Sequence, residues 1–152
     1  VRDIVRPNAT AGAEEAGRNP ASIAFPTAAT LSVNQDGDLA REASRKSICK
    51  LYHPIPHPYY DSQLRQLGFE EFADQATKLM PAGKLKEAMA LVPEEVIDTM
   101  TITGTIKECA QRIQEYQGVS DELILARTGQ RGDTNSIADY EDLFHLIDQA
   151  TD

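Results

Sequence analysis

The stretch Thr101-Ile-Thr-Gly-Thr-Ile-Lys-Glu108, continued as far as residue 126, decides the fold class of this chain. The β-branched residues 101–103 are typical of a short strand. Thr105 and Glu108 have the spacing of a capping box, in which each side chain pairs a backbone N–H that the first helical turn leaves free. Gly118 ends that helix, and residues 122–126 predict a second strand. Because two parallel strands need a crossover connection, this order predicts an α/β fold.

Composition excludes several classes of protein. The chain has 152 residues, of which 41% are hydrophobic and 26% charged, so one folded domain with a real core is expected. A net charge of -9 would repel a phosphate backbone, which argues against a nucleic-acid partner. No apolar run approaches the ~20 residues that cross a bilayer, so no membrane contact is expected.

The two cysteines and the first residue bear on the origin of the chain. Cys49 and Cys109 both fall in expected helices, where they read as small buried hydrophobes, and this favours the reducing cytoplasm. No signal peptide is present at the start. The sequence begins with Val1, close to an expected helix, and we expect a piece of a longer protein, although trimming or ordinary processing of the start gives the same sign.

The remaining elements follow from apolar periodicity and from the positions of proline and glycine. A helix is expected near residues 4–17, disturbed at Pro7 and ended by Gly17. Residues 22–33 read as a strand covered on both faces, with Pro26 at its beginning or at an irregularity because proline lacks a ladder donor. Further helices are expected over residues 38–52, 59–67, 70–79, 84–91, 93–100 and 137–150. Residues 53–100 therefore form a helical insertion between the two main strands.

Six short motifs resemble a known family when they are taken in order. They are Glu15-Ala-Gly-Arg-Asn-Pro20, Leu31-Ser-Val-Asn34, Leu67-Gly-Phe69, Leu91-Val-Pro-Glu-Glu95, Ile102-Thr-Gly-Thr105, and Gly118-Val with Leu123-Ile-Leu125. Over about residues 1–130 the chain resembles the C-terminal part of the luciferase-like oxidoreductases. That family includes flavin-dependent monooxygenases and coenzyme F420-dependent reductases, and the methylenetetrahydromethanopterin reductase branch is the most similar.

The resemblance implies a (β/α)8 barrel of which this chain holds only the C-terminal portion. Residues 23–33 would be roughly the seventh strand and residues 122–126 the eighth, with residues 101–103 as an extension outside the barrel. A complete barrel typically needs ~250 residues. We therefore expect one partial-barrel domain over residues 1–152, with two to three short parallel strands, the insertion at 53–100, and a helix-rich character as an isolated chain.

The resemblance also implies a cofactor, F420 or FMN, and a small-molecule substrate. Hydride transfer or oxygen activation would be the chemistry, with F420 slightly favoured. In this family most of the residues that bind the cofactor come from earlier strands, which this sequence does not contain. Those residues therefore have no counterpart here, and no catalytic residue is assigned. The expected partner is the remaining part of the barrel or a second copy in a homo-oligomer.

Candidate binding residues follow the two main strands, because barrel enzymes place their chemistry at the C-terminal strand ends. Asn34 follows the first strand, and Arg127, Thr128 and Gly129 follow the last. We predict that these four residues contact the cofactor. The planar fork of Arg127 suits a phosphate or carboxylate, although a solvated or salt-bridged loop arginine has the same sequence signature.

The proline-rich segment at the start of the insertion carries a second candidate site. His53, His57 and Tyr59 are predicted to border a substrate pocket as a lid, while plain packing of the insertion is the alternative. Cys49, His53 and His57 are spaced four apart, as zinc ligands on a helix would be. Prolines 54, 56 and 58 break that face, so no metal site is predicted.

Two functions remain open from the sequence. The first is the C-terminal segment of a luciferase-like F420- or FMN-dependent oxidoreductase or monooxygenase, inactive as the isolated fragment. The second is a self-contained helical interaction or dimerisation module derived from a barrel tail, whose exposed strand edges a partner would cover.

Overall fold

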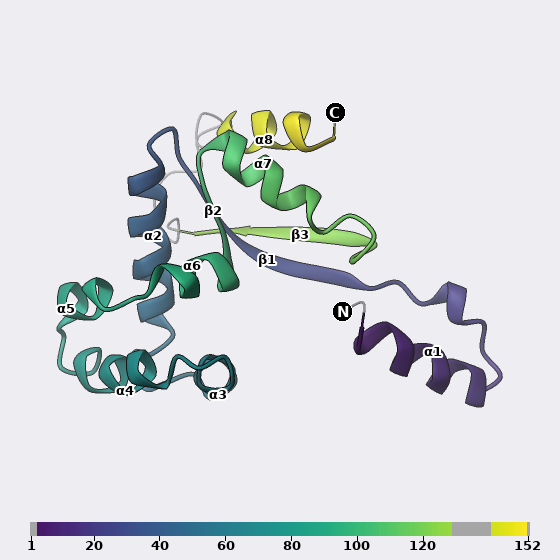
Figure 1. Ribbon diagram of the computed structural model, residues 1–152, viewed down its shortest axis with the longest axis horizontal. Coiled ribbons are helices and arrows are strands. Elements are labelled where there is room, and N and C mark those ends of the chain that lie inside the picture. The colour runs from purple at the N-terminus through teal and green to yellow at the C-terminus, as the bar shows by residue number, and fades with distance from the viewer. Residues whose placement is uncertain (1–2, 129–140, 152) are drawn as a thin grey trace.

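The computed structural model describes residues 3–128 and 141–151. Three parallel strands form its sheet in the order β2-β1-β3, where β1 is Pro26–Val33, β2 is Thr101–Gly104 and β3 is Glu122–Arg127 (Figure 1). The central strand β1 pairs with β3 from Pro26 to Leu31, and with β2 only over its last four residues. The α/β class and the parallel partial sheet are therefore confirmed, and β2 and β3 flank β1 instead of pairing with each other.

The described helices lie close to the expected ranges. They are α1 (Val5–Glu15), α2 (Gly37–Lys50), α3 (Pro58–Gln66), α4 (Glu70–Leu79), α5 (Leu85–Ala90), α6 (Glu94–Met100), α7 (Ile106–Gln114) and α8 (Glu141–Thr151), with a short 3-10 turn η1 at Pro20–Ser22. Pro7 falls in the first turn of α1, where its missing N–H does no harm, so the expected disturbance is absent. The strand begins at Pro26 and not at residue 22, because Asn19 caps η1.

Helices α7 and α8 cover one face of the sheet. Leu31 and Ile102 point to this face and are fully buried, and they pack in one cluster with Cys109 of α7 and Leu146 of α8. In Figure 1 both helices lie above the strands. This packing is the expected burial of the apolar stripe of α7 against the sheet.

The opposite face is covered only near the C-terminal end of β1. There Ser32 Oγ donates a hydrogen bond of 2.9 Å to the carbonyl of Ala40 in α2. Farther back on the same face, Ala28 and Ala126 are exposed, and Ile124 is 51% exposed.

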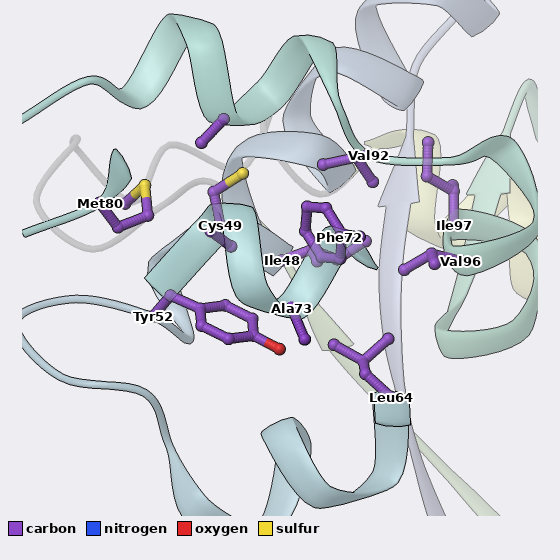
Figure 2. Packing of buried hydrophobic residues seen from close by; sticks show 12 residues of the cluster. Ile48, Cys49, Tyr52, Leu64, Phe72, Ala73, Met80, Val92, Val96 and Ile97 are labelled. Atoms are coloured by element: carbon purple, nitrogen blue, oxygen red, sulfur yellow. The ribbon is translucent and has the colours of Figure 1, made fainter. Parts of the chain in front are cut away.

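The insertion has its own hydrophobic core, which it shares with α2. Ile48 and Cys49 of α2, and Tyr52 two residues beyond its end, meet Leu64 of α3 and Phe72 of α4. The Tyr52 and Phe72 rings lie edge to face at 6.0 Å (Figure 2). Helices α5 and α6 complete this cluster. The insertion is therefore attached to the sheet through α2 and α6, and its assignment as residues 53–100 of a single domain stays a prediction.

Candidate functional site

Asn34 lies directly after β1, at the expected strand end. Its backbone N–H donates to the carbonyl of Gly104 (3.2 Å), which extends the pairing of β1 with β2 by one residue. Its side-chain Oδ1 accepts a hydrogen bond from the N–H of Asp36 (2.9 Å), and Asp36 in turn caps α2 through Asp38 N–H. The side-chain oxygen of Asn34 is thus used in the turn, and its amide nitrogen remains as the group that could contact a ligand.

Arg127 and Thr128 lie together at the end of β3. Arg127 stands opposite Leu31 in the ladder, and the Thr128 N–H donates to the Leu31 carbonyl at 2.7 Å. Asn34 follows Leu31 by three residues, so it lies about 10 Å farther along the strand direction. Arg127 and Thr128 are thus neighbours at the end of β3, and Asn34 lies beyond the end of the adjacent strand β1. Gly129, the fourth predicted residue, lies outside the described residues.

Two polar atoms at this strand end are buried without a partner. Arg127 Nη1 and Thr128 Oγ1 are shielded from solvent, and neither has a hydrogen-bond partner in the described part of the chain. Both can donate a hydrogen bond, and a guanidinium suits an anionic group. Alternation along the strand directs the two side chains to opposite faces of the sheet, so they are two separate donors at this strand end.

Alternation along β3 assigns these residues to a face. Arg127 shares its face with Leu123 and Leu125, which pack toward the helix-covered side, while Ile124 and Ala126 point to the open side. The Arg127 side chain therefore leaves the strand on the face of the sheet that α7 and α8 cover. The sequence predicted the strand end but not this orientation, because the face depends on which helices cover the sheet.

The junction between β2 and α7 contains the capping box that the sequence predicts, and Gly37 at the start of α2 lies against it. The capping box is present: Glu108 accepts from the Thr105 N–H at 2.7 Å, and its own N–H donates to Thr105 Oγ1. The Glu108 carboxylate also accepts a hydrogen bond from Thr105 Oγ1 at 2.8 Å, and the two bonds that it accepts, from the Thr105 N–H and from this hydroxyl, lower the pKa of Glu108. A Cβ added at Gly104 would lie 2.6 Å from the Glu108 carboxylate, and one added at Gly37 would lie 3.7 Å from it. Gly104, directly before the capping box, is the sequence signal for this close approach, whereas the contact with Gly37 arises only in the fold.

The predicted lid residues lie at the other end of α2. This helix has 14 residues and is therefore about 21 Å long, with Asn34 before its start and His53 after its end. His57 and Tyr60 stack at 4.9 Å, Tyr59 meets Tyr60 at 5.3 Å, and the Tyr59 side chain is largely exposed. The structure does not bring His53, His57 and Tyr59 together with Asn34, and their lid role stays a prediction.

No cluster of three potential metal ligands occurs within residues 3–128 and 141–151. Cys49 is fully buried in the insertion core, and burial raises the pKa of its thiol to about 11, whereas a metal ligand must be a thiolate. His53 and His57, the other members of the spacing, are exposed. Cys49 therefore lies in the core and the two histidines lie at the surface, although their spacing of four residues is that of ligands on one face of a helix.

Two partly exposed arginines of α2 form ion pairs with α6. Arg41 pairs with Glu94 (2.7 Å) and Asp98 (3.3 Å) of α6, and Arg45 pairs with Glu94 as well. These ion pairs connect α2 to α6, the last helix of the insertion.

In the described regions, none of the helices combines the length and the apolar character needed to cross a membrane.

Comparisons with known proteins agree with this architecture. The model of the luciferase-like monooxygenase family matches residues 3–122. A Mycobacterium tuberculosis protein assigned to the coenzyme F420-dependent oxidoreductases is 23% identical over 74 residues, which are 49% of this chain and 21% of that protein. The coenzyme F420-dependent tetrahydromethanopterin reductase of Methanopyrus kandleri superposes with a TM-score of 0.65 and 25% identity, over 82% of this chain and 35% of the reductase.

The chain thus spans only about a fifth to a third of the length of these two relatives. The structural match confirms the expected likeness to part of a barrel reductase, and the family model covers most of the chain. The chain therefore belongs to the luciferase-like monooxygenase family.

Proposed function

We propose that this chain is the C-terminal part of the (β/α)8 barrel of an F420-dependent oxidoreductase. Both relatives described above are named for their dependence on F420, which supports the deazaflavin over FMN. When bound, the deazaflavin supplies the hydride chemistry for a small-molecule substrate, while the protein binds and orients it.

One observation carries this proposal: the sheet is unfinished. On one side of β1, β2 pairs only from Thr30 to Val33, so residues 26–29 have no paired strand there in the described structure. On the far side of β3 the described chain again has no pairing strand. The open face bears Ala28, Ile124 and Ala126, small and apolar side chains that suit the inside of a barrel. A sheet open at these three places needs additional strands to enclose a pocket.

In this proposal the residues of the chain have supporting roles. Asn34, Thr128 and Gly129 contact the cofactor at the C-terminal strand ends, and Arg127 holds an anionic group. His53, His57 and Tyr59 border the substrate as part of the insertion. The free, buried thiols of Cys49 and Cys109 support a location in the cytoplasm.

The test is a titration of F420 and FMN, followed by absorbance and fluorescence, into a longer protein that contains this chain and into the chain alone. We expect F420 to bind the longer protein in preference to FMN, and neither cofactor to bind the chain alone, which should be inactive. Preferential FMN binding would overturn the cofactor assignment. Tight F420 binding by the chain alone would overturn the incomplete barrel.

A second candidate function is an interaction module that uses this barrel tail as a scaffold. An apolar hollow of about 410 Å³ beside the free edge of β3 favours it, and its lining includes Ile113, Tyr116, Leu125 and Ile147. A dimer of the chain in solution with no cofactor affinity in any longer form would support the module over the enzyme.

A further inference from the structure

We propose that Tyr52 is a positioning residue for residues 53–60, the segment with the predicted lid residues, and that its hydroxyl acts by donating a hydrogen bond to the Asp61 carboxylate. This inference rests on the proposed function, which places the segment at the substrate, but its test needs neither cofactor nor substrate. Tyr52 lies directly before the segment, and Asp61 lies directly after it in the first turn of α3. The hydrogen bond therefore joins the two ends of the segment.

The Tyr52 side chain is held in the core, so it can serve as a fixed point. The residue is fully buried, and its ring meets the Phe72 ring of α4 edge to face. Its backbone N–H donates to the carbonyl of Cys49 at the end of α2 at 3.0 Å. Removing only the hydroxyl of Tyr52 should thus leave this packing in place.

The Tyr52 hydroxyl and one oxygen of Asp61 are buried without a hydrogen bond of full geometry. Tyr52 OH and Asp61 Oδ1 are both shielded from solvent, and neither has a partner of that kind within the described regions. A buried donor and a buried acceptor each carry a desolvation cost, which a hydrogen bond between them offsets. The hydroxyl can donate and the carboxylate can only accept, so the two groups are complementary.

Packing brings Asp61 to the side of the core that the hydroxyl faces. Leu64 follows Asp61 by three residues and shares its face of α3, and Leu64 packs with Tyr52 in one buried cluster. In Figure 2 the hydroxyl end of the Tyr52 ring points toward Leu64. Burial, followed by the nearby charge of Asp61, raises the pKa of Tyr52, which agrees with a hydroxyl beside a carboxylate.

Asp61 connects this fixed point to the segment. Its Oδ2 accepts from Arg65 Nε at 3.0 Å, and Arg65 also pairs with Asp74 of α4 at 2.8 Å, so the carboxylate is held in place. The Asp61 N–H donates to the His57 carbonyl at 3.0 Å, and the His57 N–H donates to the Leu51 carbonyl at 2.7 Å. A hydrogen bond from Tyr52 to Asp61 therefore constrains the backbone on both sides of His57.

The experiment is NMR spectroscopy of the 152-residue chain, read at the His57 ring, whose signals report the Tyr60 ring at 4.9 Å. Tyr52→Phe should move the His57 ring signals most of the way to those of a free histidine, because the segment loosens while the core is kept. Asp61→Ala should move them at least as far, and Tyr52→Phe should add nothing in the double variant. Thr77→Val is the matched control, because the Thr77 hydroxyl bonds within α4, and it should leave the His57 signals unchanged.

Unchanged His57 signals in Tyr52→Phe, whatever its stability, would overturn the proposal, because the hydroxyl would then serve only packing. A further shift caused by Tyr52→Phe in the Asp61→Ala background would overturn the route through Asp61. Should a variant fail to fold, the wild-type chain decides: the Tyr52 hydroxyl proton should exchange slowly, and fast exchange with water would refute the bond. Absence of F420 binding in a longer protein overturns the proposed function and leaves these results untouched.

Discussion

At the scale of single residues, a chain of three buried hydroxyls connects the sheet to α2 and α6. Thr101 Oγ1 donates to the Ile97 carbonyl at 2.6 Å, and it lies 2.7 Å from Thr103 Oγ1, which is 2.6 Å from Ser44 Oγ. Each hydroxyl has one proton to donate. Because the proton of Thr101 is used on the carbonyl, Thr103 donates to Thr101 and Ser44 donates to Thr103.

Replacing Thr103 by valine should therefore destabilise the protein although the shape is kept. The Ser44 hydroxyl would lose its acceptor in a fully buried position, at a cost of about 1–3 kcal/mol. Urea unfolding of Thr103→Val against the wild type measures this loss. Adding Ser44→Ala should restore part of the stability, and an equally stable single variant would contradict the proposed direction of the chain.

Gly104 should be intolerant of any side chain. Its φ of +145° is a region that L-residues rarely adopt, and a Cβ would meet the Glu108 carboxylate. We expect Gly104→Ala to lower the free energy of unfolding by about 1–3 kcal/mol from backbone strain alone. The matched control is Gly12→Ala in α1, where a Cβ meets nothing within 4 Å. That variant should be neutral or slightly more stable, and equal effects at both glycines would refute this explanation.

Asp121 should make stability depend on pH. Hydrogen bonds from Arg6 and from the Phe25 N–H lower the pKa of Asp121 below its ordinary value of 3.8. Because the pKa of Asp121 is lower in the folded protein than in the unfolded chain, its carboxylate stabilises the fold at pH values above the unfolded-state pKa. This contribution disappears as the pH falls through the folded-state pKa.

Asp121→Asn should consequently be less stable than the wild type near neutral pH, with a difference that shrinks as the pH falls below about 4. Urea unfolding at several pH values tests this. A difference that stays constant down to pH 2 would exclude the carboxylate charge as its source.

At the scale of elements, the sequence predicted helices and strands well where local signals decide them. The capping box placed the start of α7, and Pro26 marked the beginning of β1. The order of the strands could not be predicted in this way, because pairing of β1 with both β2 and β3 is set by tertiary packing. The same limit applies to the site. The position of Arg127 and Thr128 at a strand end made them candidate binding residues. That their donor atoms are buried without a hydrogen-bond partner could not be predicted, because burial depends on the surrounding fold.

Thr105 should contribute to the stability of α7 through its cap. Removing the hydroxyl leaves the Glu108 N–H unpaired, so Thr105→Ala is expected to cost about 1 kcal/mol. Thr77→Ala is the matched control, because the Thr77 hydroxyl bonds back to the Ala73 carbonyl inside α4 and serves no helix start. Thermal unfolding should separate the two variants, and a harmless Thr105→Ala would show that the capping box does not stabilise the helix.

At the scale of the whole molecule, the two outer strands of the sheet, β2 and β3, differ in how well each could pair with a further strand. Beside β2, Arg41 bonds the carboxylate of Asp98, and Arg112 bonds the Asp98 carbonyl at 2.7 Å, so charged groups protect this edge. Beside β3, the hollow includes Leu123 and Leu125. We therefore infer that an additional strand joins at β3, where apolar surface remains to be buried.

Hydrogen exchange tests this account most directly. We predict that β3 amides facing away from β1 exchange rapidly in the monomeric 152-residue chain and become protected in a longer protein that supplies further strands. Amides paired between β1 and β3 should be protected in both. Slow exchange along both sides of β3 in the monomeric chain would contradict the account, because the chain would then complete its own sheet without additional strands.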